Sequence, residues 1–262
     1  MVELLFWPAL LAYGEAAVAY AGDARRPGRA GRLATWGVRL GWVIQTALLA
    51  VQAAEADGFA WDDWAGSLNL FVWLVVGVYL FWGCRARYRL LGLVVMPPAA
   101  ALLVLARLGG GTDTGVASDY STLFLVVHVG LVLAAFAGFT LAAALSGLYL
   151  WQERALKQHR PGRLLGRMPS LVSLDAVAAR TVAVALVALT IGVVAGLVRL
   201  GRESAGFDAL MGATLVTWLV YAAFLVLRHE ADWRGRRAAY LALAGFGVVV
   251  LARLGLQLTH VA

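Results

Sequence analysis

Two histidines stand inside apolar runs long enough to cross a membrane, His128 and His260. The other two, His159 and His229, lie in basic segments between such runs. An imidazole ligates iron through a ring nitrogen, and two imidazoles on facing helices supply both axial ligands of a haem. The pair therefore predicts an iron site, with haem b as the cofactor. An equally weighted alternative is that both are ordinary polar residues of a membrane protein.

The last apolar run places a polar stripe beside one of these histidines. Arg253, Gln257 and His260 follow one another at spacings of four and three, which puts them on one helical face. Arginine pairs well with carboxylates, so Arg253 is a candidate partner for a haem propionate. The alternative is that Arg253 extends to lipid headgroups, and we favour that interpretation for Arg107 and Arg199, which stand near other helix ends.

Long apolar runs recur along the whole chain, and they define the elements that must position these residues. The sequence is 62% hydrophobic and 14% charged, whereas soluble domains carry about a quarter charged residues. It predicts an all-α, polytopic membrane helix bundle, a single integral membrane domain over residues 1–262. About 20 apolar residues span the hydrocarbon. Eight transmembrane helices are expected at residues 2–21, 34–54, 66–83, 90–107, 120–151, 177–200, 209–227 and 238–260.

Connecting segments alternate in charge. Four are rich in arginine, for example "GDARRPGRAGR" and "QERALKQHRPGRLLGR", while "EADGFAWDDW" and "GGGTDTGVASDY" have no Lys or Arg. Basic loops stay in the cytoplasm, so both termini are expected on the extracytoplasmic side of a bacterial cytoplasmic membrane. This topology explains the pI of about 10.1 without a nucleic acid partner. The lipid bilayer is the expected partner, and the first helix, which carries Glu3, is expected to be retained.

Further polar residues lie within the expected spans. Arg39, Trp42, Gln45 and Gln52 are interpreted as one helix face that meets other helices through hydrogen bonds. Glu15 is interpreted as a buried acid with no assigned partner. Aromatic residues also occur in the outer loops, where an interfacial belt is favoured over a cover for a flat macrocycle. These are Phe59, Trp61, Trp64 and Tyr120.

Two stretches carry a family resemblance that covers about residues 66–262. "FDALMGATLVTWLVYAAFLVLRHEADWRGRRAAYLALAGFGVVVL" resembles the C-terminal part of cytochrome c assembly proteins of the CcsA type. Their tryptophan-rich segment is followed by a Y-L-H-x-R helix end, a W-R-G-R loop and a last helix that ends in a histidine. "HVGLVLAAFAGFTLAAALSGLYLWQERALKQ" resembles the helix that carries the family's other outer histidine, especially in the HemX-like branch.

The resemblance implies roles for particular residues. His128 and His260 match the two outer haem-ligand positions, and Asp208, Thr217 and Trp218 match the tryptophan-rich segment. Several positions depart from the pattern, including Phe207, Ala209, Ala213 and Val226, the last where CcsA proteins have an intramembrane histidine. Gln45 stands where HemX-like relatives carry a histidine. The implied protein is HemX-like and holds haem near the outer leaflet, in cytochrome c biogenesis or in control of haem biosynthesis.

Other functions stay open at this stage. The chain is expected to work with a CcsB-like partner, or as a ligand-free membrane regulator or scaffold for glutamyl-tRNA reductase. A transporter is a weaker alternative, because Pro97–Pro98 is one helix break without a symmetric counterpart. No arrangement of residues typical of an enzyme is found, so the protein is not expected to be one.

Overall fold

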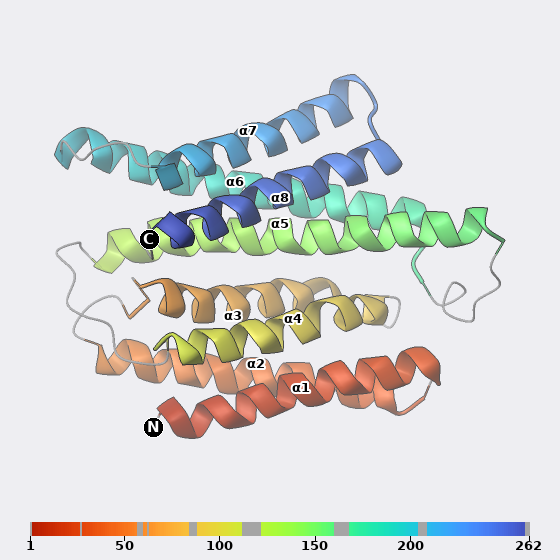
Figure 1. The fold of residues 1–262 in the computed structure, drawn as a ribbon, viewed down its shortest axis with the longest axis horizontal. Coiled ribbons are helices and arrows are strands. Elements are labelled where there is room, and N and C mark those ends of the chain that lie inside the picture. The colour runs from red at the N-terminus through yellow and green to blue at the C-terminus, as the bar shows by residue number, and fades with distance from the viewer. Residues whose placement is uncertain are drawn as a thin grey trace. The chain divides into compact units, whose positions relative to one another are not determined.

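The computed structural model describes residues 2–26, 28–56, 60–61, 63–83, 88–111, 122–159, 168–203 and 209–259. This part of the chain is all-α, as predicted, and contains eight helices (Figure 1). They are α1 (Val2–Arg25), α2 (Ala30–Glu55), α3 (Trp64–Gly83), α4 (Arg89–Leu108), α5 (Thr122–Lys157), α6 (Leu171–Glu203), α7 (Ala209–Glu230) and α8 (Arg236–Thr259).

Seven of these helices, α1 to α7, are long and apolar enough to cross a membrane, judged over the described residues. The protein is therefore a multi-pass membrane protein. The predicted eighth span is present as the 24-residue helix α8 but is not among the seven. Helix α5 has 36 residues, and at about 1.5 Å per residue it is roughly 54 Å long.

The helices extend beyond the apolar runs that predicted them. Helix α6 begins at Leu171 rather than at residue 177. The backbone N–H of Ser173 donates to the side-chain oxygen of Ser170 at 3.2 Å, which satisfies one of the donors left open at a helix start. The last turns of α5 continue to Lys157. Hydropathy marks the lipid-crossing part of a helix, whereas capping and water-facing polar residues set its ends.

The chain divides into two compact units, Met1–Val126 with Gly162–Pro169, and Val127–Pro161 with Ser170–Ala262. The first unit contains α1 to α4. In it α1 and α2 lie side by side (Figure 1), because Gly37 and Gly41 bring the α2 backbone against Ala12 and Tyr13 of α1. Small residues at such contacts let membrane helices approach closely.

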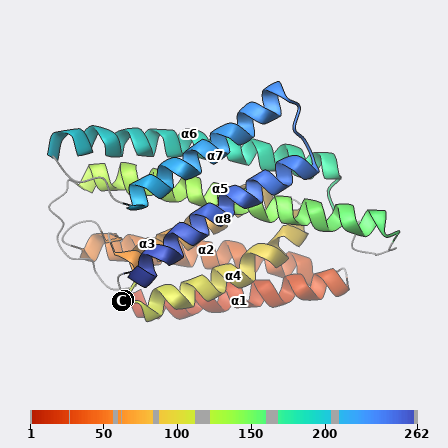
Figure 2. The ribbon, with the colours of Figure 1, turned by 45° about the horizontal axis from the view of Figure 1, so that its top comes forward.

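The second unit contains α5 from Val127 onward and α6 to α8. The rings of Phe139 in α5 and Tyr221 in α7 stack with centroids 3.7 Å apart and planes inclined by 4°. The Tyr221 hydroxyl donates to the Ala242 carbonyl of α8 at 3.1 Å, and α7 and α8 run next to each other (Figure 2). One buried tyrosine thus ties three helices of this unit together.

Candidate functional site

His128 lies near the start of α5 and is half-buried. Its Nδ1 is 2.8 Å from the carbonyl oxygen of Gly192 in α6. A carbonyl oxygen only accepts hydrogen bonds, so Nδ1 carries the proton in this contact. In the neutral ring the lone pair then belongs to Nε2.

The imidazole rests directly on the backbone of α6. A Cβ added at Gly196 would lie 2.7 Å from Cε1 of the ring, and one added at Gly192 would lie 2.8 Å from Val132. Positions 192 and 196 are four apart and share a helix face. Gly196 therefore leaves room for the ring, while Gly192 leaves room for Val132 and supplies the carbonyl that the ring contacts. An alanine at position 196 would force the ring to move.

This arrangement suits a metal ligand. Histidines that bind metals almost always donate their other ring N–H to a carbonyl or carboxylate, which fixes the tautomer and the ring orientation. The contact with Gly192 has this form, with Nε2 as the ligating nitrogen. His128 would therefore be able to ligate a haem iron. The same contact would also satisfy a structural histidine, and both sequence interpretations stay predictions.

Trp218, the second predicted site residue with a described side chain, is anchored to the same helix. Its indole N–H donates to the hydroxyl of Thr190 in α6 at 2.9 Å, and that hydroxyl donates to the Leu186 carbonyl at 2.7 Å. Thr190 is two residues from Gly192, so α6 holds His128 and Trp218 at neighbouring heights. Thr217 is buried, and its hydroxyl donates to the Ala213 carbonyl of its own helix at 2.8 Å.

The remaining predicted site residues lie outside the described part of the structure. These are His260, Asp208 and the side chain of Arg253. The bis-histidine pair therefore stays a prediction. Val226, where the resemblance implies an intramembrane histidine in CcsA proteins, is 57% exposed on α7.

The first unit holds a buried network of amide side chains. Gln45 accepts a hydrogen bond from the Tyr13 hydroxyl at 2.7 Å and donates to Asn69 Oδ1 at 3.0 Å. Asn69 in turn donates to Gln52 Oε1 at 3.1 Å and to the Gly111 carbonyl at 3.2 Å. The prediction of hydrogen bonding between helices at Gln45 and Gln52 is confirmed. Sequence reasoning missed Tyr13 and Asn69, since each is one polar group within an apolar run.

Two interpretations of the first unit are wrong. Arg39 does not share the buried face of Gln45; it is exposed, and its guanidinium lies 5.2 Å from the Trp36 ring centroid. Six residues turn a helix by about 600°, so Arg39 and Gln45 point about 120° apart. Glu15 is likewise exposed rather than buried. Arg107 forms an ion pair with Glu3 of α1, and its extension to lipid headgroups stays a prediction.

The outer-loop aromatics fall into two groups. The Trp61 indole N–H donates to Gln52 Oε1 at 3.5 Å, at the edge of the amide network, while Trp64 is 46% exposed. Phe59 and Tyr120 lie outside the described residues. Trp61 thus contributes to the packing of the first unit, and the cover for a macrocycle stays a prediction.

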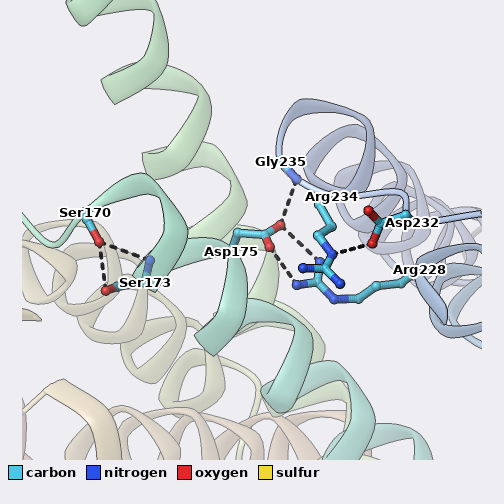
Figure 3. A network of polar contacts seen from close by, with 7 residues as sticks. All are labelled: Ser170, Ser173, Asp175, Arg228, Asp232, Arg234 and Gly235. Atoms are coloured by element: carbon cyan, nitrogen blue, oxygen red, sulfur yellow. Dashed lines mark hydrogen bonds and ion pairs between the residues drawn. The ribbon is translucent and has the colours of Figure 1, made fainter.

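The sequence analysis did not identify the polar cluster at one end of the second unit (Figure 3). Asp175 of α6 accepts two hydrogen bonds from the Arg228 guanidinium of α7, at 2.6 and 3.1 Å, and one from the Gly235 N–H at 2.9 Å. Gly235 has a φ of +64°, and a Cβ there would lie 2.7 Å from the Tyr149 hydroxyl. Asp175 therefore joins α6, α7 and the entry to α8.

Comparison with known proteins assigns this chain to a family. The family described as "Cytochrome C assembly protein" matches residues 61–261. The chain is 25% identical to the cytochrome c biogenesis protein CcsA of Gloeothece citriformis, covering 86% of this chain and 84% of that protein. It is 26% identical to CcsA of Guillardia theta, covering 83% and 80%, and 27% identical to CcsA of Porphyra purpurea, covering 73% of each.

Proposed function

Because the chain belongs to the cytochrome c assembly protein family, we propose that it holds haem near the outer leaflet of its membrane through His128 and His260. The family places this multi-pass protein in cytochrome c biogenesis. The observation that carries the proposal is the 2.8 Å contact between His128 Nδ1 and the Gly192 carbonyl. It selects the tautomer with the lone pair on Nε2, the nitrogen that an iron-ligating histidine needs.

The residues divide the work of binding. His128 and His260 would ligate the iron, Arg253 would pair with a propionate, and Asp208 and Trp218 would contact the haem. In this proposal haem is held and passed on without being changed, so the protein binds haem reversibly and does not act as an enzyme. The Thr190 hydroxyl fixes Trp218 at 2.9 Å, and the glycines of α6 fix the His128 ring.

The proposed topology has eight spans, including α8, and both termini on the extracytoplasmic side of a bacterial cytoplasmic membrane. It is supported by the alternation of arginine-rich and acidic segments along the sequence. It would bring the start of α5 and the end of α8 to the same side, as a shared haem requires. A reporter fused after Arg26 should therefore report the cytoplasm, and one fused after Gly110 the outer side.

A CcsB-like partner is the proposed companion of this chain. The support is that this chain is similar, over most of its length, to proteins named cytochrome c biogenesis protein CcsA. Within the family we propose the HemX-like branch, because Ala213 and Val226 depart from the CcsA pattern. A deletion strain should lose holocytochrome c. Unchanged cytochrome c with altered glutamyl-tRNA reductase would instead favour the regulatory alternative.

The decisive experiment is an absorption spectrum of the purified protein, oxidised and reduced, from haem-supplied cells. Wild type should show a Soret band of a bis-histidine haem. His128→Ala and His260→Ala should each lose at least about tenfold in bound haem, since an axial ligand is removed. His229→Ala is the matched control, because His229 lies on the surface at the end of α7, and it should retain the band.

The proposal fails if wild type shows no Soret band after haem supplementation. It also fails if His128→Ala and His229→Ala bind equal amounts of haem, because the band would then come from another site. Circular dichroism of each variant verifies that the helices remain folded.

A further inference from the structure

One end of the second unit carries many charges, and most of its acidic side chains are already paired with cations. Among the described residues, three pairs of a carboxylate with a lysine or arginine occur there: Glu153–Lys157 at 2.7 Å, Asp175–Arg228 at 2.6 Å and Asp232–Arg234 at 2.6 Å. Arg154, Arg236 and Arg237 form no salt bridge within the described part of the chain, and all three are exposed. Positive charge is therefore in excess at this end.

One of these arginines contacts a tyrosine, and a second comes near it. Arg236 Nη2 donates to the Tyr240 hydroxyl at 3.3 Å, one turn along α8, and its guanidinium lies 5.4 Å from the centroid of the same ring. Arg154, from the last turns of α5, lies within electrostatic reach of Tyr240. A neutral phenol oxygen stabilises a guanidinium less than an anionic oxygen does, because the anion adds the attraction between opposite charges. The two cations are thus gathered where an anion would bind.

Aromatic residues place this cluster at the height of lipid headgroups. Trp151 is 47% exposed and Tyr240 is 42% exposed, and such side chains concentrate at the membrane–water interface. Trp151 is three residues before Arg154, so the two share a face of α5. Arg237 lies with its guanidinium 6.0 Å from the Trp233 ring centroid, which adds a third cation next to the aromatic side chains.

We propose that Arg154, Arg236 and Tyr240 form a binding site for the headgroup of an anionic phospholipid. The two guanidiniums bind the phosphodiester oxygens, the tyrosine hydroxyl donates to one of them, and Trp151 packs against the upper acyl chain. Basic sites between transmembrane helices recognise acidic lipids through this chemistry. The site joins α5 to α8, so lipid binding stabilises the contact between these two helices.

The test measures lipid binding by native mass spectrometry of the detergent-purified protein, with phosphatidylglycerol or phosphatidylcholine added. Wild type should retain phosphatidylglycerol in preference to phosphatidylcholine. Arg154→Gln and Arg236→Gln should each weaken that binding about fivefold, the contribution of one basic residue at an anionic surface. Arg234→Gln is the matched control, since Arg234 is exposed but paired with Asp232, and it should change binding by less than about twofold.

Three outcomes would overturn the proposal. The first is equal retention of the two lipids by wild type. The second is equal loss in Arg234→Gln and Arg236→Gln, which would indicate general surface charge. The third is binding of millimolar inorganic phosphate that competes fully with lipid, which would assign the site to a soluble anion. Tyr240→Phe keeps the ring and removes the hydroxyl, and its binding should fall less than that of the arginine variants.

Discussion

The buried amides of the first unit and the histidine of the second unit are both polar side chains in apolar helices, but their partners differ. Gln45 and Asn69 use the oxygen and the nitrogen of each amide, with both side chains and backbone carbonyls as partners. His128 contacts a backbone carbonyl that can only accept a hydrogen bond. The first arrangement pairs the oxygen and the nitrogen of each amide, while the second selects one tautomer of the neutral ring.

We interpret this difference as one between polar residues that hold helices together and a polar residue that is proposed to bind a ligand. A network whose donors and acceptors match one another holds helices in register. A tautomer-selecting contact prepares a nitrogen lone pair for a ligand. Polar spacing in the sequence does not distinguish the two cases, and the proposed function assigns His128 to the second through its contact with Gly192.

The largest effect on stability should come from breaking the amide network. Asn69→Leu removes one acceptor of the Gln45 side-chain amide and one donor to Gln52 Oε1. Unsatisfied buried groups cost about 1–3 kcal/mol each, and membrane hydrogen bonds fall at the low end, so about 3 kcal/mol in total is expected. Reversible unfolding in mixed micelles would measure the loss, with the haem spectrum of the folded protein unchanged.

A matched control for this change is Thr214→Val. The Thr214 hydroxyl donates only to the Leu210 carbonyl of its own helix, at 2.8 Å, so its removal should cost less than about 0.5 kcal/mol. Equal losses in the two variants would show that the network does not join the helices.

A somewhat smaller loss should follow Asp175→Ala in the second unit. The variant removes both contacts with Arg228 and the acceptor for the Gly235 N–H. About 2 kcal/mol is expected, because both charged side chains are largely shielded from solvent and the arginine loses its partner. The same unfolding assay applies. Arg234→Gln, which removes the exposed ion pair with Asp232, should lower the free energy of unfolding far less. A loss as small as in that variant would contradict a role for Asp175 as the tie between three helices.

The sequence predicted where the helices lie, but it predicted less well where each helix ends and which polar side chains pair. Apolar runs located all eight helices, whereas Ser170 and Ser173 start α6 before its apolar run begins. Gln45 and Gln52 were recognised as facing protein because amides are costly in lipid. Arg39 was misassigned because spacings of three accumulate rotation away from the first residue. Asp175 was missed because its partner Arg228 is far away in the sequence.

The candidate site was predictable only in part. His128 is unusual enough within an apolar run to be selected by residue type alone. The glycines at 192 and 196 that receive its ring carry no such signal, because glycine is common throughout the chain. Trp218 was identified through the family resemblance, and its anchor Thr190 emerges only from the packing of α6 against α7.

A still smaller effect tests the contact between His128 and α6. Gly196→Ala places a methyl group 2.7 Å from His128 Cε1, so the ring must turn. We expect bound haem to fall about fivefold while stability changes by less than about 1 kcal/mol. Gly130→Ala, on α5 with nothing within 4 Å of the added methyl, should leave haem unchanged. If both variants bind haem as wild type does, the orientation set by α6 has no bearing on the ligand.

The smallest effect should come from the ion pair that joins α4 to α1. Arg107 is about one-third exposed and Glu3 is largely exposed, and such pairs contribute about 0–1 kcal/mol. Arg107→Gln should therefore lower stability by about 0.5 kcal/mol, and the difference should shrink at high salt. Thermal unfolding at two salt concentrations would detect it. A loss as large as that of Asn69→Leu would place this pair with the buried network instead.

The length of α5 has a mechanical consequence. Its 36 residues contain no proline and form one continuous helix, about 54 Å long against a hydrocarbon thickness of about 30 Å. His128 stands two turns from one end, and the charges of Glu153 and Lys157 stand at the other. The candidate iron ligand and the charged tip are thus parts of one continuous helix. A rigid-body shift of that helix would therefore move both together.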